Sequence, residues 1–331
     1  MLAAFNYAGY EVNHAWGEGG HNGKHSAAIM PDILRWLWKG HPEPIKPGRA
    51  KERRIEVLLP GEDWELVSEG HKFTEGPAVN KDGEVFFTDV PEGKIFRVAL
   101  DGKVSVFVDN TPGVNGLMFG PDGKLYCCSG TKEQIVRYDA SGKAEVLIEH
   151  APCNDLVVLA SGNGYYTDPT NHKVWRFSPD GQRAVVDEGI GFPNGVIVTP
   201  DQTLLTVSDT FGRYSYSFQI QPDGSLAFKQ PDGHLHRTDD SGGTGADGMT
   251  VDTEGRYYVT TTLGVQVLDQ MGRVHFIIAK PQPAWLSNVV FGGPDLNYLY
   301  ATCQDKVYRR KLAAKGAIPW QAPFKPTAPR L

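Results

Sequence analysis

A unit of about 40 residues recurs six times in this chain, and this repetition restricts its fold more than any other feature. Each unit begins with a polar residue and a short apolar run, followed by a turn and a β-rich run such as EVFFTD. A second turn leads to an alternating run such as KIFRVA, and a final turn leads to a fourth short strand. Asp-Gly and Asn-Gly pairs between apolar runs are strong hairpin signals. Four strands per unit are typical of a propeller blade, so we predict an all-β fold, a six-bladed β-propeller. The alternative is a β-sandwich in which the repetition arises by chance.

The repeats also set the boundaries of the expected domains. A strand-like stretch, RIEVLLP…WELV, starts at Arg54 before the first unit, and we predict that it completes the sixth blade and closes the ring. The expected propeller covers residues 51–315, between an N-terminal segment of residues 1–50 and a C-terminal tail of residues 316–331. The insertion KQPDGHLHRTDDSGGTGA lengthens the interval between the fourth and fifth units.

The composition argues against several classes of partner. A formal net charge of −6 argues against nucleic acid and anionic membranes, because these bind clustered Lys and Arg. No apolar run approaches the roughly 18 residues of a membrane span, and the N-terminus lacks the basic start and apolar stretch of a signal peptide. We therefore expect a soluble protein, cytoplasmic or periplasmic, and the sequence leaves its compartment open. The four cysteines include no CxxC pair, which favours buried thiols over a zinc site or a disulfide framework.

The first polar residue of each unit carries the functional prediction. In a propeller the innermost strand of each blade lines the central channel, so residues at one repeat position lie at one height around the axis. This position holds only carboxylates and carboxamides, namely Glu75, Asn115, Asn154, Asn194, Asp247 and Asn288. Burying these polar side chains without partners would cost free energy. A hard cation can bind their oxygens and offset this cost, since calcium takes about six to eight oxygen ligands. The lack of His and Cys in the ring disfavours zinc, copper and iron. We expect one divalent metal, calcium first, with Mg²⁺ or Zn²⁺ as substitutes; the alternative is that these residues only form turns.

Five motifs, in this order, give the chain a recognisable signature: FTEGPAVNKDGEVFFTDV, CNDLVVLASGNGYYTDP, PNGVIVTPDQTLLTVSDT, ADGMTVDTEGRYYVTT and SNVVFGGPDLNYLYAT. From about residue 54 to residue 313 the chain resembles the senescence marker protein/gluconolactonase family, which includes regucalcin and bacterial sugar lactonases. The resemblance implies a single calcium at the mouth of the channel, held by Glu75, Asn194 and Asp247 with Asn154 nearby. It also implies a lactone substrate. The related diisopropyl-fluorophosphatases use the same arrangement on phosphoester substrates.

The chain departs from the family pattern at two places. Cys153 precedes Asn154 where many members read Pro-Asn-Asp or place an Arg shortly before the Asn, so the Arg that grips sugar hydroxyls in some members is not identified here. The Pro-Asp-Gly motif reads Ala-Asp-Gly, with Asp247 retained. These changes leave the metal ligands in place and put the sugar preference in doubt.

The N-terminal segment belongs to a different pattern. Residues 1–45 resemble the C-terminal end of an α/β-hydrolase of the enterobactin-esterase type, in which His21 or His25 would be a catalytic base. No G-x-S-x-G nucleophile motif occurs in this chain, and a His without its Ser cannot perform that chemistry. We therefore interpret the segment as a remnant of an esterase–lactonase fusion. Its run IMPDILRWLWKG has the apolar spacing of a helix, and its apolar face either docks on the propeller or stays unpacked.

Lactone hydrolysis requires a polarised carbonyl, a deprotonated water and a stabilised oxyanion, and a calcium with an open position supplies the first and the third. Asp247 is the expected general base and Glu75 the second candidate. Asn154 and Asn194 orient the metal and the substrate, while Asn115, Asn288 and His71 are expected substrate contacts.

Three other functions remain open. The first is a non-catalytic ligand-binding propeller, since fold alone does not imply chemistry. The second is a phosphotriester or aryl-ester hydrolase using the same calcium. The third is a strictosidine-synthase-like propeller, which does not need the acidic and amide residues of the ring.

Overall fold

The computed structural model describes residues 2, 5, 10–17, 20, 22–43 and 57–328. The chain divides into two compact units, Met1–Ile55 and Glu56–Leu331. The second unit contains both the propeller and the residues predicted as a C-terminal tail, 316–331.

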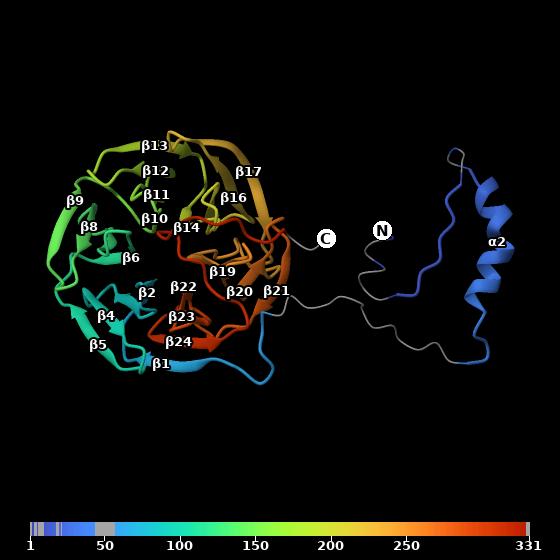
Figure 1. Cartoon of the computed structure of the whole chain (residues 1–331), viewed down its shortest axis with the longest axis horizontal. Helices are drawn as coiled ribbons and strands as arrows, with labels where there is room; N and C mark the ends of the chain where they lie inside the picture. Colours follow the sequence, from blue (N-terminus) through green and yellow to red (C-terminus); the bar gives the residue numbers. More distant parts are fainter. Residues whose placement is uncertain are drawn as a thin grey trace. The chain divides into compact units, whose positions relative to one another are not determined.

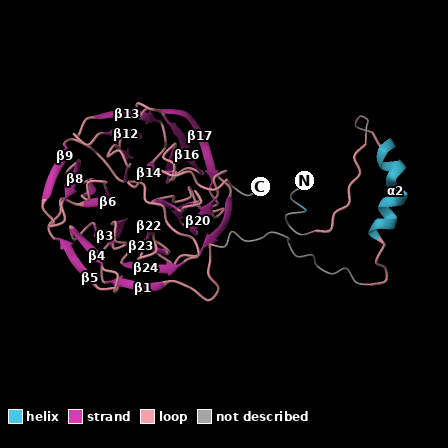
Figure 2. Cartoon of the chain, viewed as in Figure 1, coloured by secondary structure: helices cyan, strands magenta, loops and turns pink. Residues whose placement is uncertain are grey.

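The first unit contains helix α2 (Lys24–Leu37), drawn in cyan in Figure 2. This confirms the predicted helix, which begins five residues earlier than the apolar run that indicated it. No side chain of the helix is buried, and its apolar residues Met30, Leu34 and Leu37 are exposed. The ring of His25 lies 3.3 Å from the backbone oxygen of Ala15, while His21 lies outside the described residues.

The second unit confirms the predicted six-bladed propeller. Six four-stranded antiparallel sheets surround one axis, and the chain builds them in order around the ring (Figure 1). The first three blades, from the innermost strand outward, are β2 (Thr74–Val79), β3 (Val85–Asp89), β4 (Lys94–Val98), β5 (Val104–Val108); β6 (Val114–Phe119), β7 (Leu125–Ser129), β8 (Gln134–Tyr138), β9 (Ala144–Ile148); and β10 (Leu156–Val158), β11 (Gly164–Asp168), β12 (Lys173–Phe177), β13 (Arg183–Glu188). The other three are β14 (Pro193–Val198), β15 (Leu204–Asp209), β16 (Tyr214–Ile220), β17 (Leu226–His234); β18 (Met249–Val251), β19 (Tyr257–Thr261), β20 (Gly264–Leu268), β21 (Val274–Ile278); and β22 (Leu286–Gly292), β23 (Tyr298–Cys303), β24 (Lys306–Lys311), β1 (Glu65–Glu69).

The ring closes through strand β1, as predicted. β1 pairs antiparallel with β24, from Glu65 opposite Arg309 to Glu69 opposite Lys306. The sixth blade thus takes three strands from the C-terminal part of the chain and its outermost strand from the N-terminal side. The insertion after the fourth unit lengthens β17 in its first part and forms the connection to β18 in the rest.

Hydroxyl side chains join neighbouring blades next to the channel. Near the end of the second strand of a blade, a Thr or Ser donates a hydrogen bond to a backbone oxygen on the entry to the following blade. Thr167 reaches Asn194 at 2.6 Å, Ser208 reaches Asp247 at 2.8 Å, and Thr260 reaches Ser287 at 2.9 Å. Thr88 reaches Asn115 at 3.4 Å, and in the second blade Cys128 stands at this position. These bonds fix the height of each inner strand relative to the next.

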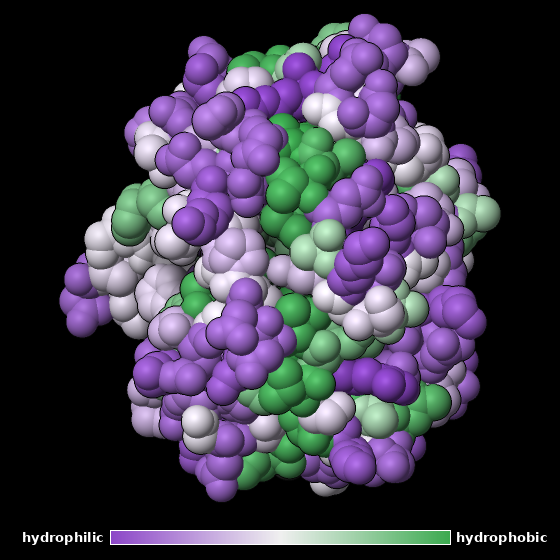
Figure 3. Space-filling model, turned by 90° about the vertical axis from the view of Figure 1, so that its left-hand side faces the viewer, coloured by the Kyte–Doolittle hydropathy of each residue, from purple (hydrophilic) through white to green (hydrophobic). Residues whose placement is uncertain are grey.

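The core lies between adjacent blades and consists mainly of aliphatic and aromatic side chains from the first three strands of each blade. The outermost strands are less covered, and each of β5, β9 and β13 exposes one valine, at Val106, Val146 and Val185. Figure 3 accordingly shows a mainly hydrophilic outer surface interrupted by narrow apolar strips. The four cysteines are free and buried, as the sequence indicated. Among the described residues, no helix is long and apolar enough to cross a bilayer.

The C-terminal segment after β24 crosses the face of the propeller, where it is drawn in red in Figure 1. Ala317 N–H donates to the Val251 oxygen of the fifth blade at 3.0 Å. The Gln202 amide of the fourth blade donates to the Pro319 oxygen at 2.7 Å. Ile318, 9% exposed, packs against the hydrophobic core of the sixth and first blades.

We expect Ile318→Ala to lower the free energy of unfolding by about 2–3 kcal/mol, because it removes buried aliphatic contacts between the segment and the inner strands. The control is Val106→Thr on the exposed strand β5, which keeps a β-branched side chain. It should change the free energy of unfolding by less than about 0.5 kcal/mol. Urea denaturation measures both values, and equal effects would show that the segment does not pack against the core.

Candidate metal centre

The inner strands bring most of the predicted ring residues to one end of the channel. Glu75 lies on β2, Asn115 on β6 and Asn194 on β14, whereas Asn154 and Asp247 lie just before β10 and β18. The side chains of Glu75, Asn194 and Asp247 are buried, with exposed fractions of 5–6%. Asn115 and Asn154 are half-buried.

The sixth member of the ring differs from the prediction. A backbone N–H just after the ring residue donates to the oxygen of the ring residue in the following blade: Gly116 to Asn154 at 3.0 Å, Gly195 to Asp247 at 3.2 Å, and Gly248 to Ser287 at 2.8 Å. Ser287, not Asn288, therefore occupies the ring position of the sixth blade. Its hydroxyl donates to the Thr74 oxygen at 2.8 Å and ties the sixth blade to the first.

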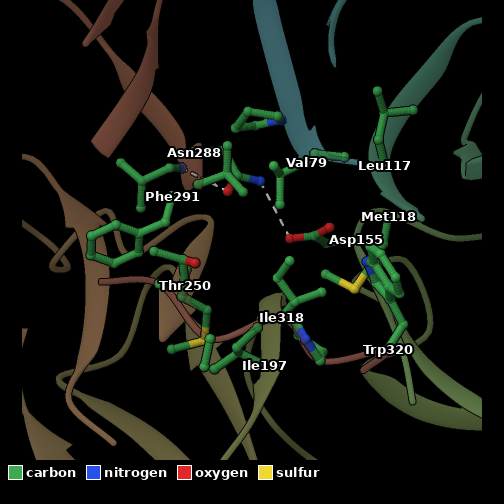
Figure 4. A pocket seen from close by; sticks show the side chains of 18 of the residues that line it. Val79, Leu117, Met118, Asp155, Ile197, Thr250, Asn288, Phe291, Ile318 and Trp320 are labelled. Carbon is green, nitrogen blue, oxygen red and sulfur yellow. Dashed lines mark hydrogen bonds between the residues drawn. The ribbon is translucent and has the colours of Figure 1, made fainter. Parts of the chain in front are cut away.

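Asn288 sits one residue further along, where it meets a carboxylate that the sequence analysis did not select. Asn288 Nδ2 lies 3.4 Å from Asp155 Oδ2 and 3.4 Å from Glu75 Oε2, so it donates between two acidic groups from different blades. Figure 4 shows Asn288 and Asp155 facing each other across the channel. Both side chains are buried.

Two glycines make room for this pair. Asp155 and Asn288 occupy the repeat position that is glycine in the other four blades. A Cβ on Gly116 would lie 2.5 Å from Asp155 Oδ1, and a Cβ on Gly248 would lie 1.8 Å from Asn288 Cγ. The signal for Asp155 was thus present in the sequence, as an acidic residue at a position that is otherwise glycine or amide.

Three buried carboxylates share this part of the channel, and burial raises the pKa of each. Burial and the nearby charge of Asp247 hold the pKa of Glu75 well above its usual range. Burial raises the pKa of Asp155 to about 7, although the Leu156 N–H and Asn288 oppose the shift. Burial also raises the pKa of Asp247 to about 7, with the Trp285 N–H opposing it. Without a cation, the group therefore retains protons near neutral pH.

The donor set fits a hard cation. The amide oxygens of Asn115 and Asn194 are buried and have no hydrogen-bond partner, which is unfavourable for a polar atom unless something else binds it. The neighbouring acidic groups add carboxylate oxygens to these amide oxygens, and calcium prefers both kinds of ligand. In the described part of the chain, no three His, Cys, Asp or Glu side chains converge closely enough to hold a metal by themselves. A cation here would need the amide oxygens as well.

The structure places His71 away from this group. Its Nε2 lies 2.7 Å from the Ser68 hydroxyl, and its Nδ1 lies 3.6 Å from Asp89. The ring packs edge-on against Phe87 and Phe96 of the first blade. Burial lowers the pKa of His71 in spite of Asp89. These contacts give it a structural environment between the first and sixth blades, so the expected substrate contact is not supported.

A small cavity lies between the Asp155–Asn288 pair and the C-terminal segment. It offers about 30 Å³ to water, enough for one or two molecules. Its walls are mostly apolar and include Met118 and Ile197, and Ile318 and Trp320 line it from the C-terminal segment (Figure 4). The acidic group is therefore bounded on this side by a nearly dry interior.

Comparisons with known proteins agree with this architecture. The chain is 26% identical to the gluconolactonase of Zymomonas mobilis over 269 residues, which cover 69% of this chain and 75% of that protein. It is 24% identical to pentonolactonase XacC of Haloferax volcanii, with 72% of this chain and 83% of the relative covered. A crystal structure of the calcium-binding protein regucalcin from Agrobacterium tumefaciens superposes with a TM-score of 0.65 at 18% identity, covering 79% of this chain and 95% of regucalcin.

The family match covers most of the propeller and does not include the N-terminal segment, so the esterase-like origin of residues 1–45 stays a prediction. The model of the SMP-30/gluconolactonase/LRE-like region matches residues 73–305, from the strand that carries Glu75 to the turn after β23. This chain belongs to the SMP-30/gluconolactonase/LRE-like family.

Proposed function

We propose that this protein is a divalent-cation-dependent hydrolase of sugar lactones, with calcium as the cation. The observation that carries the proposal is the buried, partnerless amide oxygen of Asn194 beside three buried carboxylates. The lactonases among the relatives support the substrate class. The calcium binding named for regucalcin supports the cation.

The residues that would hold the cation are Glu75, Asn194 and Asp247, with Asn154 at the half-buried side of the ring. Asp155 and Asn288 would lie behind them, where Asn288 donates to both Glu75 and Asp155 and so spreads the negative charge. A divalent cation held there would act as a Lewis acid toward an ester carbonyl.

Asp247 would accept the proton of the attacking water. One of its oxygens already accepts the Trp285 N–H, so the carboxylate is held in one orientation. Glu75 is the second candidate, but its Oε2 accepts the N–H of Gly76 at 2.5 Å and faces Asn288, which leaves it less free to take a proton. The geometry therefore favours Asp247 as the general base.

Recognition of the sugar would fall to neutral groups. The arginine expected from some relatives has no counterpart next to Asn154, where Cys153 stands instead. Asn115 and Asn154 are half-buried residues, and their amides would exchange hydrogen bonds with sugar hydroxyls. This arrangement suits a neutral polyol lactone better than a charged one.

We expect chelator-treated protein to lose hydrolysis of gluconolactone, measured by acid release, and to regain it when calcium is added, because the cation supplies the Lewis acid. A phosphotriester assayed in parallel covers the second ester class. Calcium binding with turnover of the phosphotriester alone would replace the lactone, binding without turnover would indicate a ligand-binding propeller, and activity that persists in chelator would contradict cation dependence.

We expect Asp247→Asn to lower kcat for the lactone by about 10²–10⁴-fold, the usual contribution of a general base, and to leave the melting temperature close to that of the wild type. Asp223→Asn removes an equal charge from an exposed turn outside the channel and serves as the control. Near-normal turnover of the Asp247 variant would show that another group takes the proton.

We expect the cation-free protein to lose stability as the pH rises from about 5 to 8. A carboxyl with a raised pKa stabilises the fold below its unfolded value of about 4, and this contribution is lost as the pH passes the folded value, here about 7 for Asp155 and Asp247. The increase in melting temperature on adding calcium should therefore be larger at pH 8 than at pH 5. Thermal denaturation in EGTA and in calcium tests this, and an increase independent of pH would mean that calcium binds elsewhere.

A further inference from the structure

A tryptophan outside the ring makes a direct contact with the proposed general base. Trp285 Nε1 donates to Asp247 Oδ2 at 2.7 Å, across 38 residues of sequence. The indole is 37% exposed, so its other parts reach the surface. A Cβ on Gly245 would lie 3.3 Å from its ring, which places the indole over the entry to the fifth blade. Nothing in the repeat pattern selects this residue.

The loop that carries Trp285 is held firmly to the sixth blade. Within it, the Lys280 ammonium donates to the Ala284 oxygen at 3.0 Å. The Gln282 amide donates to the Cys303 oxygen at 2.7 Å and accepts from the Tyr308 hydroxyl at 3.3 Å. An anchored donor loses little freedom when it binds its partner, so it can fix that partner's orientation.

The bond also determines how the Asp247 carboxylate is used. Its Oδ2 accepts a hydrogen bond from the Trp285 indole N–H, a neutral group that donates and does not accept. The Asp247 side chain, at the entry to the fifth blade, is thus held by Trp285 of the sixth blade. Groups that orient ligands in this way commonly change metal affinity or activity by about 10–100-fold when they are removed.

We propose that Trp285 is a positioning residue, whose N–H locks the Asp247 carboxylate in the orientation that binds the cation and receives the proton. The inference rests on the proposed function of Asp247. It predicts a loss of cation affinity and of kcat without a loss of stability, which a residue that only supports the fold would not show.

The chain contains a matched control. Trp175 Nε1 donates to Asp168 Oδ2 at 3.3 Å, so the third blade has the same kind of indole–carboxylate bond. Asp168 lies on β11, and Asn171 satisfies the same carboxylate. Replacing either tryptophan by Phe removes one N–H and keeps an aromatic ring. Of these two tryptophans, Trp285 contacts a residue that lines the channel, Asp247, and Trp175 contacts Asp168.

The experiment compares Trp285→Phe with Trp175→Phe by calorimetric titration of calcium, by kcat and KM for gluconolactone, and by melting temperature. For Trp285→Phe we expect calcium affinity and kcat to fall about ten-fold or more, with KM within about two-fold and the melting temperature unchanged; Trp175→Phe should leave affinity and kcat at wild-type values. Wild-type affinity in Trp285→Phe, or equal losses in both variants, would overturn the proposal.

Two further measurements keep the result interpretable. Gln282→Ala removes the hydrogen bonds that anchor the loop but keeps the Trp285 side chain, so it should give a smaller loss of calcium affinity. If Trp285→Phe fails to fold, wild-type calcium affinity in Gln282→Ala would overturn the proposal. The calcium titration needs no substrate. Failure of the lactone assay in the wild type would therefore refute the proposed reaction, while the titration still decides the role of Trp285.

Discussion

The structure depends on closing a ring of six sheets, each of which is twisted and has two edges. The pairing of β1 with β24 removes the break between the first and last blades, and hydroxyl groups of the second strands then join the inner strands of neighbouring blades. These joints set the relative height of the inner strands. Side chains from blades that are far apart in the sequence meet only because all six blades keep the same height.

Closure also creates an electrostatic problem that the chain does not solve with its own charges. Glu75, Asp155 and Asp247 are buried together, and no Lys or Arg contacts them in the described residues. Neutral donors, Asn288 and Trp285, offset part of the cost. Buried carboxylates in this condition either keep their protons or bind a cation. Burying three carboxylates together lowers the stability of the fold. We therefore assign this group to function.

The sequence predicted the blades well because a blade is a local unit whose turns and alternating strands lie within about 40 residues. It also located Glu75, Asn194 and Asp247, since these open their repeats. The prediction was wrong in the sixth blade by one residue, where it placed Asn288 in the ring instead of Ser287. A shift of one position along a strand turns the side chain to the other face.

Other features of the site depend on contacts between distant parts of the chain. Asp155 enters the channel because its neighbour in the second blade is the glycine Gly116, and Trp285 reaches Asp247 from another blade. His71 lies only four residues from Glu75, yet its packing turns it between two blades. Proximity in sequence does not determine such orientations.

The C-terminal segment gives the channel a property that the ring alone would not have. Because Ile318 and Trp320 line the cavity beyond the Asp155–Asn288 pair, the C-terminal segment narrows the channel on that side. The proposed hydrolysis of a neutral lactone would release an anionic product beside the same acidic group. With a cation bound there, the anionic product and the next substrate would compete for the same position, so turnover would depend on how quickly the product leaves.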